Sequence, residues 1–121
     1  MKIAAFALAL AFILGVSLPV SADILQVQNV TEEIWDLVGP PEQRNSEYLG
    51  NNATFGLIVT TDGAVLIDPN GSERGASMID DVVQALTDQP VRSSINTGGQ
   101  DHRCLGSVYW RVMTESGVLG I

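Results

Sequence analysis

The chain has 121 residues, a formal net charge of −8 and a single cysteine. Its six basic residues form no cluster, which argues against nucleic acid or an anionic membrane surface as a partner. One cysteine also excludes an internal disulfide. The length suits one small domain with a modest core.

The N-terminal segment 1–22 has the three parts of a secretory signal peptide. Lys2 is a short basic region, residues 3–16 form an apolar run, and Val20-Ser21-Ala22 place small residues where a signal peptidase cuts. The apolar run is shorter than the about 20 residues that span a bilayer. Cleavage leaves residues 23–121, with five Arg against 14 acidic residues and a net charge of −9. We therefore expect an exported protein, periplasmic or secreted, with no membrane attachment after cleavage.

The mature chain begins with two short β-type segments. Ile24, Leu25 and Val27 form the first, residues 29–33 lie between, and residues 34–38 form the second. The second ends at Gly39-Pro40-Pro41, because proline cannot continue a paired strand. The polar residues 42–52 predict a loop.

Residues 55–60 and 64–68 predict a β-hairpin, because Thr61-Asp62-Gly63 between two apolar runs is a strong turn signal. Asp68 ends the second strand, just before Pro69-Asn70-Gly71. Local sequence leaves two roles for this carboxylate. It caps its own turn, or it serves a functional site at the exit of a buried strand.

A helix is predicted next, with Ser72 as its N-cap. Five apolar residues recur at helical spacing: Ala76, Ile79, Val82, Val83 and Leu86. Residues 87–90 end the helix, and residues 91–96 predict a further strand. The order of strand, hairpin, helix, strand, turn and helix indicates an α/β domain.

A Gly-rich turn (residues 97–104) follows this strand and carries the only histidine, His102, directly after Asp101. Both are ligands suited to a divalent metal, but zinc usually takes three or four protein ligands. Any further ligand must come from an acidic residue, Cys104, water or another chain. Burial is the usual state of a free cysteine, and we expect it for Cys104, while pairing with another molecule and reactivity stay open.

After the turn, a second helix is expected to bury Leu105, Val108, Tyr109 and Val112, although Gly106 weakens it. Residues 113–117 form a connector, and residues 118–121 open another strand.

Two segments resemble the metallo-β-lactamase fold superfamily. Residues 52–69 resemble its opening hairpin, and Ile95-Asn96-Thr97 with Asp101-His102 and Leu105-Gly106 resembles its metal-binding turn. The helix between them has the expected place and length. The resemblance covers residues 34–121 and implies an α/β fold in which the chain is the N-terminal half of an αββα sandwich.

In that family the turn reads His-x-His-x-Asp-His, and most members are zinc hydrolases. Asp101 and His102 match the last two ligands, so the resemblance implies that they face one zinc ion. Asp68 matches the acidic residue that ends the first hairpin and supports the hydrogen bonding of the site. The resemblance thus gives Asp68 and Asp101 catalytic roles.

The two earlier histidines of that pattern are missing. Aligned without a gap, their places hold Thr97 and Gly99, and a one-residue gap gives Gly98 and Gln100. None of these is a good zinc ligand. We therefore expect the zinc site to be incomplete.

Three hypotheses on function remain open. The first is an exported metal-dependent hydrolase that activates water on zinc to attack a small-molecule substrate. It would be a variant or truncated member, impaired on its own, because family members are longer and take later ligands from their second half. The second is a non-catalytic exported α/β binding domain that keeps the fold without a complete metal site. The third is an unrelated small α/β domain with a chance Asp-His pair.

A half-sandwich also leaves the apolar face of its sheet uncovered. Uncovered apolar faces and strand edges favour association. Self-association through the uncovered sheet is therefore predicted.

Overall fold

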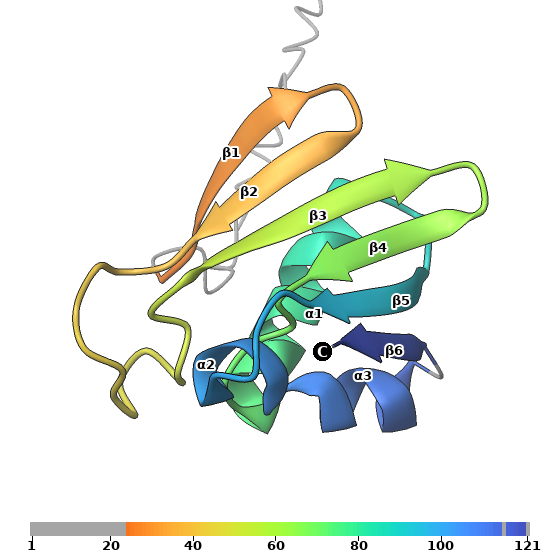
Figure 1. Ribbon diagram of the computed structural model, residues 1–121. Coiled ribbons are helices and arrows are strands. Elements are labelled where there is room, and N and C mark those ends of the chain that lie inside the picture. Colours follow the sequence, from red (N-terminus) through yellow and green to blue (C-terminus); the bar gives the residue numbers. More distant parts are fainter. Residues whose placement is uncertain (1–23, 115, 121) are drawn as a thin grey trace, which may run out of the picture.

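A computed structural model of the chain describes residues 24–114 and 116–120 (Figure 1). The signal peptide predicted for residues 1–22 lies outside these residues. Within them, six strands form one mixed sheet in the order β1-β2-β3-β4-β5-β6. The strands are β1 (Gln26–Thr31), β2 (Ile34–Val38), β3 (Thr54–Thr60), β4 (Gly63–Ile67), β5 (Val91–Asn96) and β6 (Gly117–Gly120), and the helices are α1 (Glu73–Leu86), α2 (Asp101–Cys104) and α3 (Ser107–Met113). No helix of the described part has the length and apolar character needed to cross a bilayer.

The predicted hairpin is confirmed as the antiparallel pair β3 and β4, in which Thr60 faces Gly63. Gly63 has a φ of 132°, a backbone conformation that L side chains rarely adopt. The first strand was predicted too early. β1 runs from Gln26 to Thr31 and takes in residues expected to connect two strands, because a register shift between Asn29 and Thr31 extends its pairing with β2.

Helix α1 is confirmed with its predicted cap and buried stripe. The Ser72 hydroxyl accepts a hydrogen bond from the Gly75 N–H at 2.9 Å and satisfies one of the free donors of the first turn. The apolar stripe of the helix packs with one face of the sheet in a single core. That core holds Leu25, Leu37, Phe55, Leu57, Ala64, Leu66, Ala76, Met78, Ile79, Val82, Val83, Val91 and Trp110.

The opposite face of the sheet is also apolar. Strand register places its side chains in two adjacent rows, since residues two apart on a strand point to the same side. We call this surface the open face; it consists of Ile34, Ile58, Val65, Ile67, Ile95 and Leu119. In Figure 1, α1 lies behind the sheet and the viewer looks onto the open face. Leu119 is 60% exposed and the other five are half-buried, and none of the six belongs to the core.

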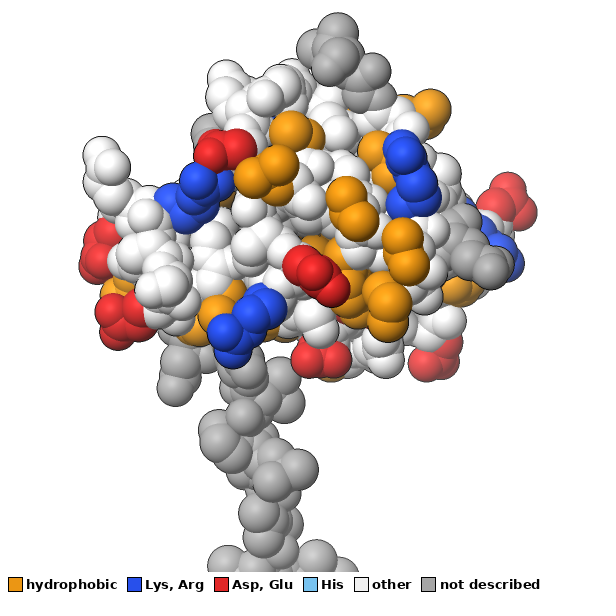
Figure 2. All heavy atoms as spheres, turned by 90° about the horizontal axis from the view of Figure 1, so that it is seen from below, with side chains coloured by type: hydrophobic (Ala, Val, Ile, Leu, Met, Phe, Trp, Pro, Cys, Tyr) orange, Lys and Arg blue, Asp and Glu red, His pale blue; other side chains and the backbone are white. Residues whose placement is uncertain are grey.

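The helix predicted after the Gly-rich turn differs from the structure. It is divided into α2 and α3, and Trp110 is its fully buried residue. Three residues of the predicted buried face are instead exposed: Leu105 by 53%, Val108 by 67% and Val112 by 67%. Figure 2, the view from below in Figure 1, shows hydrophobic side chains gathered on this side with charged ones among them.

The division at Gly106 has a local cause. The Gly106 N–H donates to the Asn70 carbonyl at 2.6 Å, and a Cβ added at Gly106 would lie 2.2 Å from the Pro69 carbonyl oxygen. The Trp110 indole N–H donates to that same oxygen at 3.2 Å. Because α3 docks onto the turn after β4 in this way, Trp110 points into the core. Val108 and Val112, which were predicted to be buried, stay exposed.

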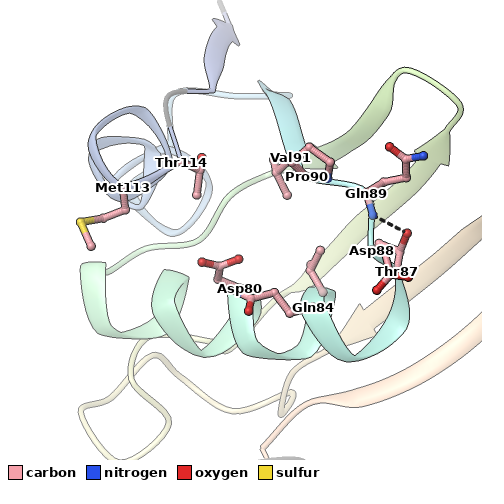
Figure 3. Close-up of a pocket in the computed structure, with 10 residues that line it drawn as sticks. Asp80, Gln84, Thr87, Asp88, Gln89, Pro90, Val91, Met113 and Thr114 are labelled. Carbon is pink, nitrogen blue, oxygen red and sulfur yellow. Dashed lines mark hydrogen bonds between the residues drawn. The ribbon is translucent and has the colours of Figure 1, made fainter.

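The Tyr109 hydroxyl ties α3 to α1. It donates to the Asp80 carboxylate at 2.8 Å, and its ring packs edge-on against Trp110 with centroids 5.3 Å apart. Burial raises the pKa of Tyr109, and the hydrogen bond to Asp80 raises it further. A cavity of about 500 Å³ opens beside this contact, between α1 and the end of α3. Figure 3 shows Asp80 and Gln84 on one side of it and Met113 on the other.

Gly106→Ala is expected to destabilise the fold by about 1–3 kcal/mol, because the new methyl group meets backbone that cannot move aside freely. Gly99→Ala is the matched control: nothing lies within 4 Å of a Cβ there. Its free energy of unfolding should stay within about 0.5 kcal/mol of the parent. Urea unfolding measures both, and equal effects of the two substitutions would contradict the docking of α3 on Pro69.

Because of Tyr109, we expect the folded protein to lose stability at alkaline pH. Its pKa is raised on folding, so the folded state holds the phenolic proton more tightly than the unfolded state. That contribution is complete below the ordinary pKa of about 10 and is lost as the pH rises through the raised value. In Tyr109→Phe the thermal midpoint should depend less on pH across this range. Equal pH dependence in both proteins would contradict the prediction.

Candidate functional site at the carboxyl end of the central strands

The predicted site residues follow two neighbouring strands. β4 and β5 are parallel, with Ile67 paired to Ile95, so both strands end at the same edge of the sheet. Asp68 follows β4, Thr97 follows β5, and α2 begins at Asp101. In Figure 1, α2 lies beside this edge. Open α/β sheets commonly bind ligands at such a carboxyl edge.

The Asp68 carboxylate binds the start of the Gly-rich turn. It accepts hydrogen bonds from the Thr97 N–H at 2.8 Å and from the Thr97 hydroxyl at 2.7 Å. Its own N–H donates to the Ile95 carbonyl at 2.8 Å, so both backbone and side chain join β4 to β5. Asp68 is only 8% exposed and has a φ of 56°. The carboxylate therefore reaches across to the next strand, where the N–H and the hydroxyl of Thr97 both donate to it.

Arg103 completes a three-residue cluster that sequence reasoning missed. Its Nη1 donates to the Thr97 hydroxyl oxygen at 2.5 Å and lies 3.3 Å from Asp68 Oδ2. The buried carboxylate thus has a cation beside it, which offsets the cost of burying its charge. One signal in the sequence could have found Arg103. Arginine is the only basic residue type besides His102 in residues 23–121, and Arg103 directly follows the Asp-His pair.

Asp101, the first residue of α2, is paired with a second arginine. Arg44 Nη2 lies 2.5 Å from Asp101 Oδ2, and both side chains are partly exposed, by 40% and 53%. Arg44 comes from the segment predicted as a loop, which carries no helix or strand. The pair closes one side of a hollow of about 360 Å³, which Gln43 and Asn52 also line.

The two predicted carboxylates line different hollows. Asp68 and Arg103 line a second one of about 210 Å³, together with Ala53 and Thr54. His102 lies in α2, and its side chain is outside what the structure describes.

Cys104 is half-buried, which corrects the expectation of full burial. Its thiol lies 3.9 Å from the Gly99 carbonyl oxygen, within the Gly-rich turn. The reason is that Cys104 ends α2, a helix of only four residues that contributes no residue to the core.

The described residues do not fit a zinc ion. Among the side chains that the structure places, no three from His, Cys, Asp and Glu gather as a metal-binding group. The Asp68 and Asp101 carboxylates each face a guanidinium, and Thr97 binds Arg103. A fixed positive charge beside each carboxylate competes with a metal cation for it. No catalytic step through zinc follows from this arrangement.

Comparisons with known proteins identify the fold of this chain through similar solved structures. Neither a scan of protein-family models nor a search of curated proteins finds a match. Among solved structures, the chain is similar to the metallo-β-lactamase FIM-1 from Pseudomonas aeruginosa in its mono-zinc form, with a TM-score of 0.64 and 12% identity over 80% of this chain and 42% of that one.

Two further metallo-β-lactamases match similarly. The enzyme from Pontibacter korlensis gives a TM-score of 0.63 and 17% identity over 79% of this chain and 43% of its own. The enzyme from Hirschia baltica gives a TM-score of 0.60 and 16% identity over 80% of this chain and 42% of its own. The chain thus spans less than half the length of these structures. Such low identities show the fold alone, which is that of the N-terminal half of a metallo-β-lactamase sandwich.

Asp68→Asn is expected to lower the free energy of unfolding by about 1–3 kcal/mol, because it removes a charge-assisted bond and leaves Arg103 beside a neutral group. Asparagine tolerates the positive φ, so backbone strain does not contribute to the expected loss of stability. The control is Asp81→Asn on the exposed side of α1, with an expected change within about 0.5 kcal/mol. Urea unfolding distinguishes them, and equal stabilities would contradict a structural role for the Asp68 carboxylate.

Proposed function

We propose that this chain, which has the fold of the N-terminal half of a metallo-β-lactamase, is an exported α/β binding domain without a complete zinc site. The observation that carries the proposal is the pairing of both predicted catalytic carboxylates with arginine, Asp68 with Arg103 and Asp101 with Arg44. Export rests on the signal-like segment 1–22 and points to the periplasm or the exterior.

The positive charge of Arg103 supports the absence of a complete zinc site. Arg103 touches Thr97, whose position corresponds to the first histidine in the ungapped alignment of the family motif. A dication about 4 Å from that guanidinium meets a repulsion of about 4 kcal/mol for each of its charges at a surface-like dielectric. Neither Thr97 nor Gly99 supplies a nitrogen to offset this cost.

A metal-dependent hydrolase is the second candidate. Asp101 and His102 keep the last two positions of the family's metal motif, at the start of α2. The similar solved structures are metallo-β-lactamases, one of them in a mono-zinc form. Under this reading Asp101 and His102 hold zinc, Asp68 supports the turn, and a small molecule is the substrate. Arg44 must then release Asp101 before the metal binds.

Zinc binding separates the two candidates. We expect the purified exported chain to hold far less than one equivalent of zinc by elemental analysis. The double variant Thr97→His/Gly99→His restores both missing histidines and should bind zinc at least about tenfold more tightly, since each added ligand contributes directly to affinity. Competition with a chromophoric chelator measures this. Circular dichroism confirms folding, because Thr97 also binds Asp68.

Gly99→His alone is the control, since a side chain at Gly99 meets no neighbour. It should bind zinc less tightly than the double variant. Near-stoichiometric zinc in the unaltered, folded chain, lost in both Asp101→Ala and His102→Ala, would overturn the proposal. That result would favour the hydrolase, and zinc-dependent cleavage of a chromogenic β-lactam would then establish it.

A further inference from the structure

We propose that Arg103 is a built-in cation that occupies the place of a metal ion at the carboxyl edge of the sheet. Its guanidinium binds the oxygen atoms of Asp68 and Thr97 and thereby makes the site select against metal cations. The proposal rests on the proposed function and deepens it, because it names the residue that keeps the binding domain free of zinc. The other arginine of the site, Arg44, has only a minor part in this selection.

Three polar groups at this edge lie within hydrogen-bond distance of one another. The Thr97 hydroxyl donates to Asp68 Oδ2 at 2.7 Å. Arg103 Nη1 lies 2.5 Å from that hydroxyl oxygen and 3.3 Å from Asp68 Oδ2. A hydroxyl has one proton and two lone pairs. Because the proton goes to the carboxylate, the lone pairs are left for a donor or a cation. Carboxylate and hydroxyl oxygens suit hard cations, and the guanidinium lies where such a cation would bind them.

Arg103 also lies against the position of the first missing histidine. The ungapped alignment of the family motif assigns that position to Thr97, which Arg103 touches. The alignment with a one-residue gap assigns it to Gly98, where an added Cβ would lie 3.5 Å from Arg103 Cδ, an ordinary van der Waals contact. Under both alignments, the side chain of Arg103 therefore lies beside the residue from which the first zinc ligand would come.

The two arginine pairs of the site differ in how firmly they hold. The side chains of Arg44 and Asp101 are 40% and 53% exposed, and those of Arg103 and Asp68 are 37% and 12% exposed. An exposed ion pair shifts an equilibrium by about fivefold at most. Removing the partner of a buried carboxylate is much less favourable, because an uncompensated charge stays behind. Arg44 can therefore release Asp101 at little cost, whereas Arg103 stays on Asp68.

Chemical rescue tests whether the site needs a cation. Arg103→Ala should lower the thermal midpoint of the exported chain. Methylguanidinium chloride at millimolar concentration should raise that midpoint again, and the rise should saturate, because the small cation binds the same two oxygens. Sodium chloride at equal ionic strength should not produce this effect. The parent and Arg44→Ala, which both keep Arg103, should show no saturable rise. Absence of a saturable response in folded Arg103→Ala overturns the proposal.

Three further variants separate charge from size. Arg103→Lys keeps the charge, and Arg103→Met keeps most of the length without it, so the lysine variant should melt at the higher temperature. Arg103→Ala/Asp68→Asn also removes the buried carboxylate charge. This double variant should melt above Arg103→Ala, even if Arg103→Ala does not fold, and should ignore methylguanidinium. A methionine variant as stable as the lysine variant overturns the proposal, as does a double variant that melts no higher than Arg103→Ala.

Zinc affinity tests the selection against metals. In the Thr97→His/Gly99→His background, adding Arg103→Met should tighten zinc binding at least about a hundredfold, because a repelling charge about 4 Å from a dication is removed. Adding Arg44→Met should tighten it about fivefold at most. Competition with a chromophoric chelator measures both, and circular dichroism confirms folding. Equal gains from the two substitutions, or no gain from Arg103→Met, overturn this proposal. Zinc in the unaltered chain is a separate result, which decides the proposed function.

Discussion

The hydrogen bonds between the Asp68 carboxylate and Thr97 are the constraint on which this edge of the molecule depends. They join the exits of β4 and β5, two parallel strands with a 14-residue helix between them. Parallel strands have no tight turn to fix their ends relative to each other. The carboxylate supplies that connection from a buried position, and Arg103 balances its charge. The path of the Gly-rich turn follows from this cluster.

The turn after β4 is also the platform for the C-terminal helices. Its carbonyl groups at Pro69 and Asn70 accept hydrogen bonds from Trp110 and Gly106. The position of α3 is therefore fixed by backbone groups of this turn. One short segment therefore organises both sides of the sheet edge: its side chain holds the Gly-rich turn, and its carbonyls hold α3. The open face takes no part in this arrangement.

Sequence predicted the elements whose signals are local. The Asp-Gly hairpin, the capped helix and the strand over residues 91–96 each depend on neighbours a few positions away, and all three are present. The partner of Asp68 lies 29 residues further on, and no local pattern encodes that distance. The arginine pairs were missed for the same reason. The buried face of α3 was predicted from spacing alone, and the docking of Gly106 on Pro69 shifted it to Trp110.

Position 68 therefore satisfies two independent requirements with one residue type. Its backbone has a φ of 56°, which among the common residues only glycine, asparagine and aspartate accept at low cost. Its side chain must also be an anion short enough to reach Thr97 from the strand end. Aspartate meets both conditions at the lowest cost. Backbone shape and charge thus favour aspartate at this position, whether or not the domain ever holds a metal.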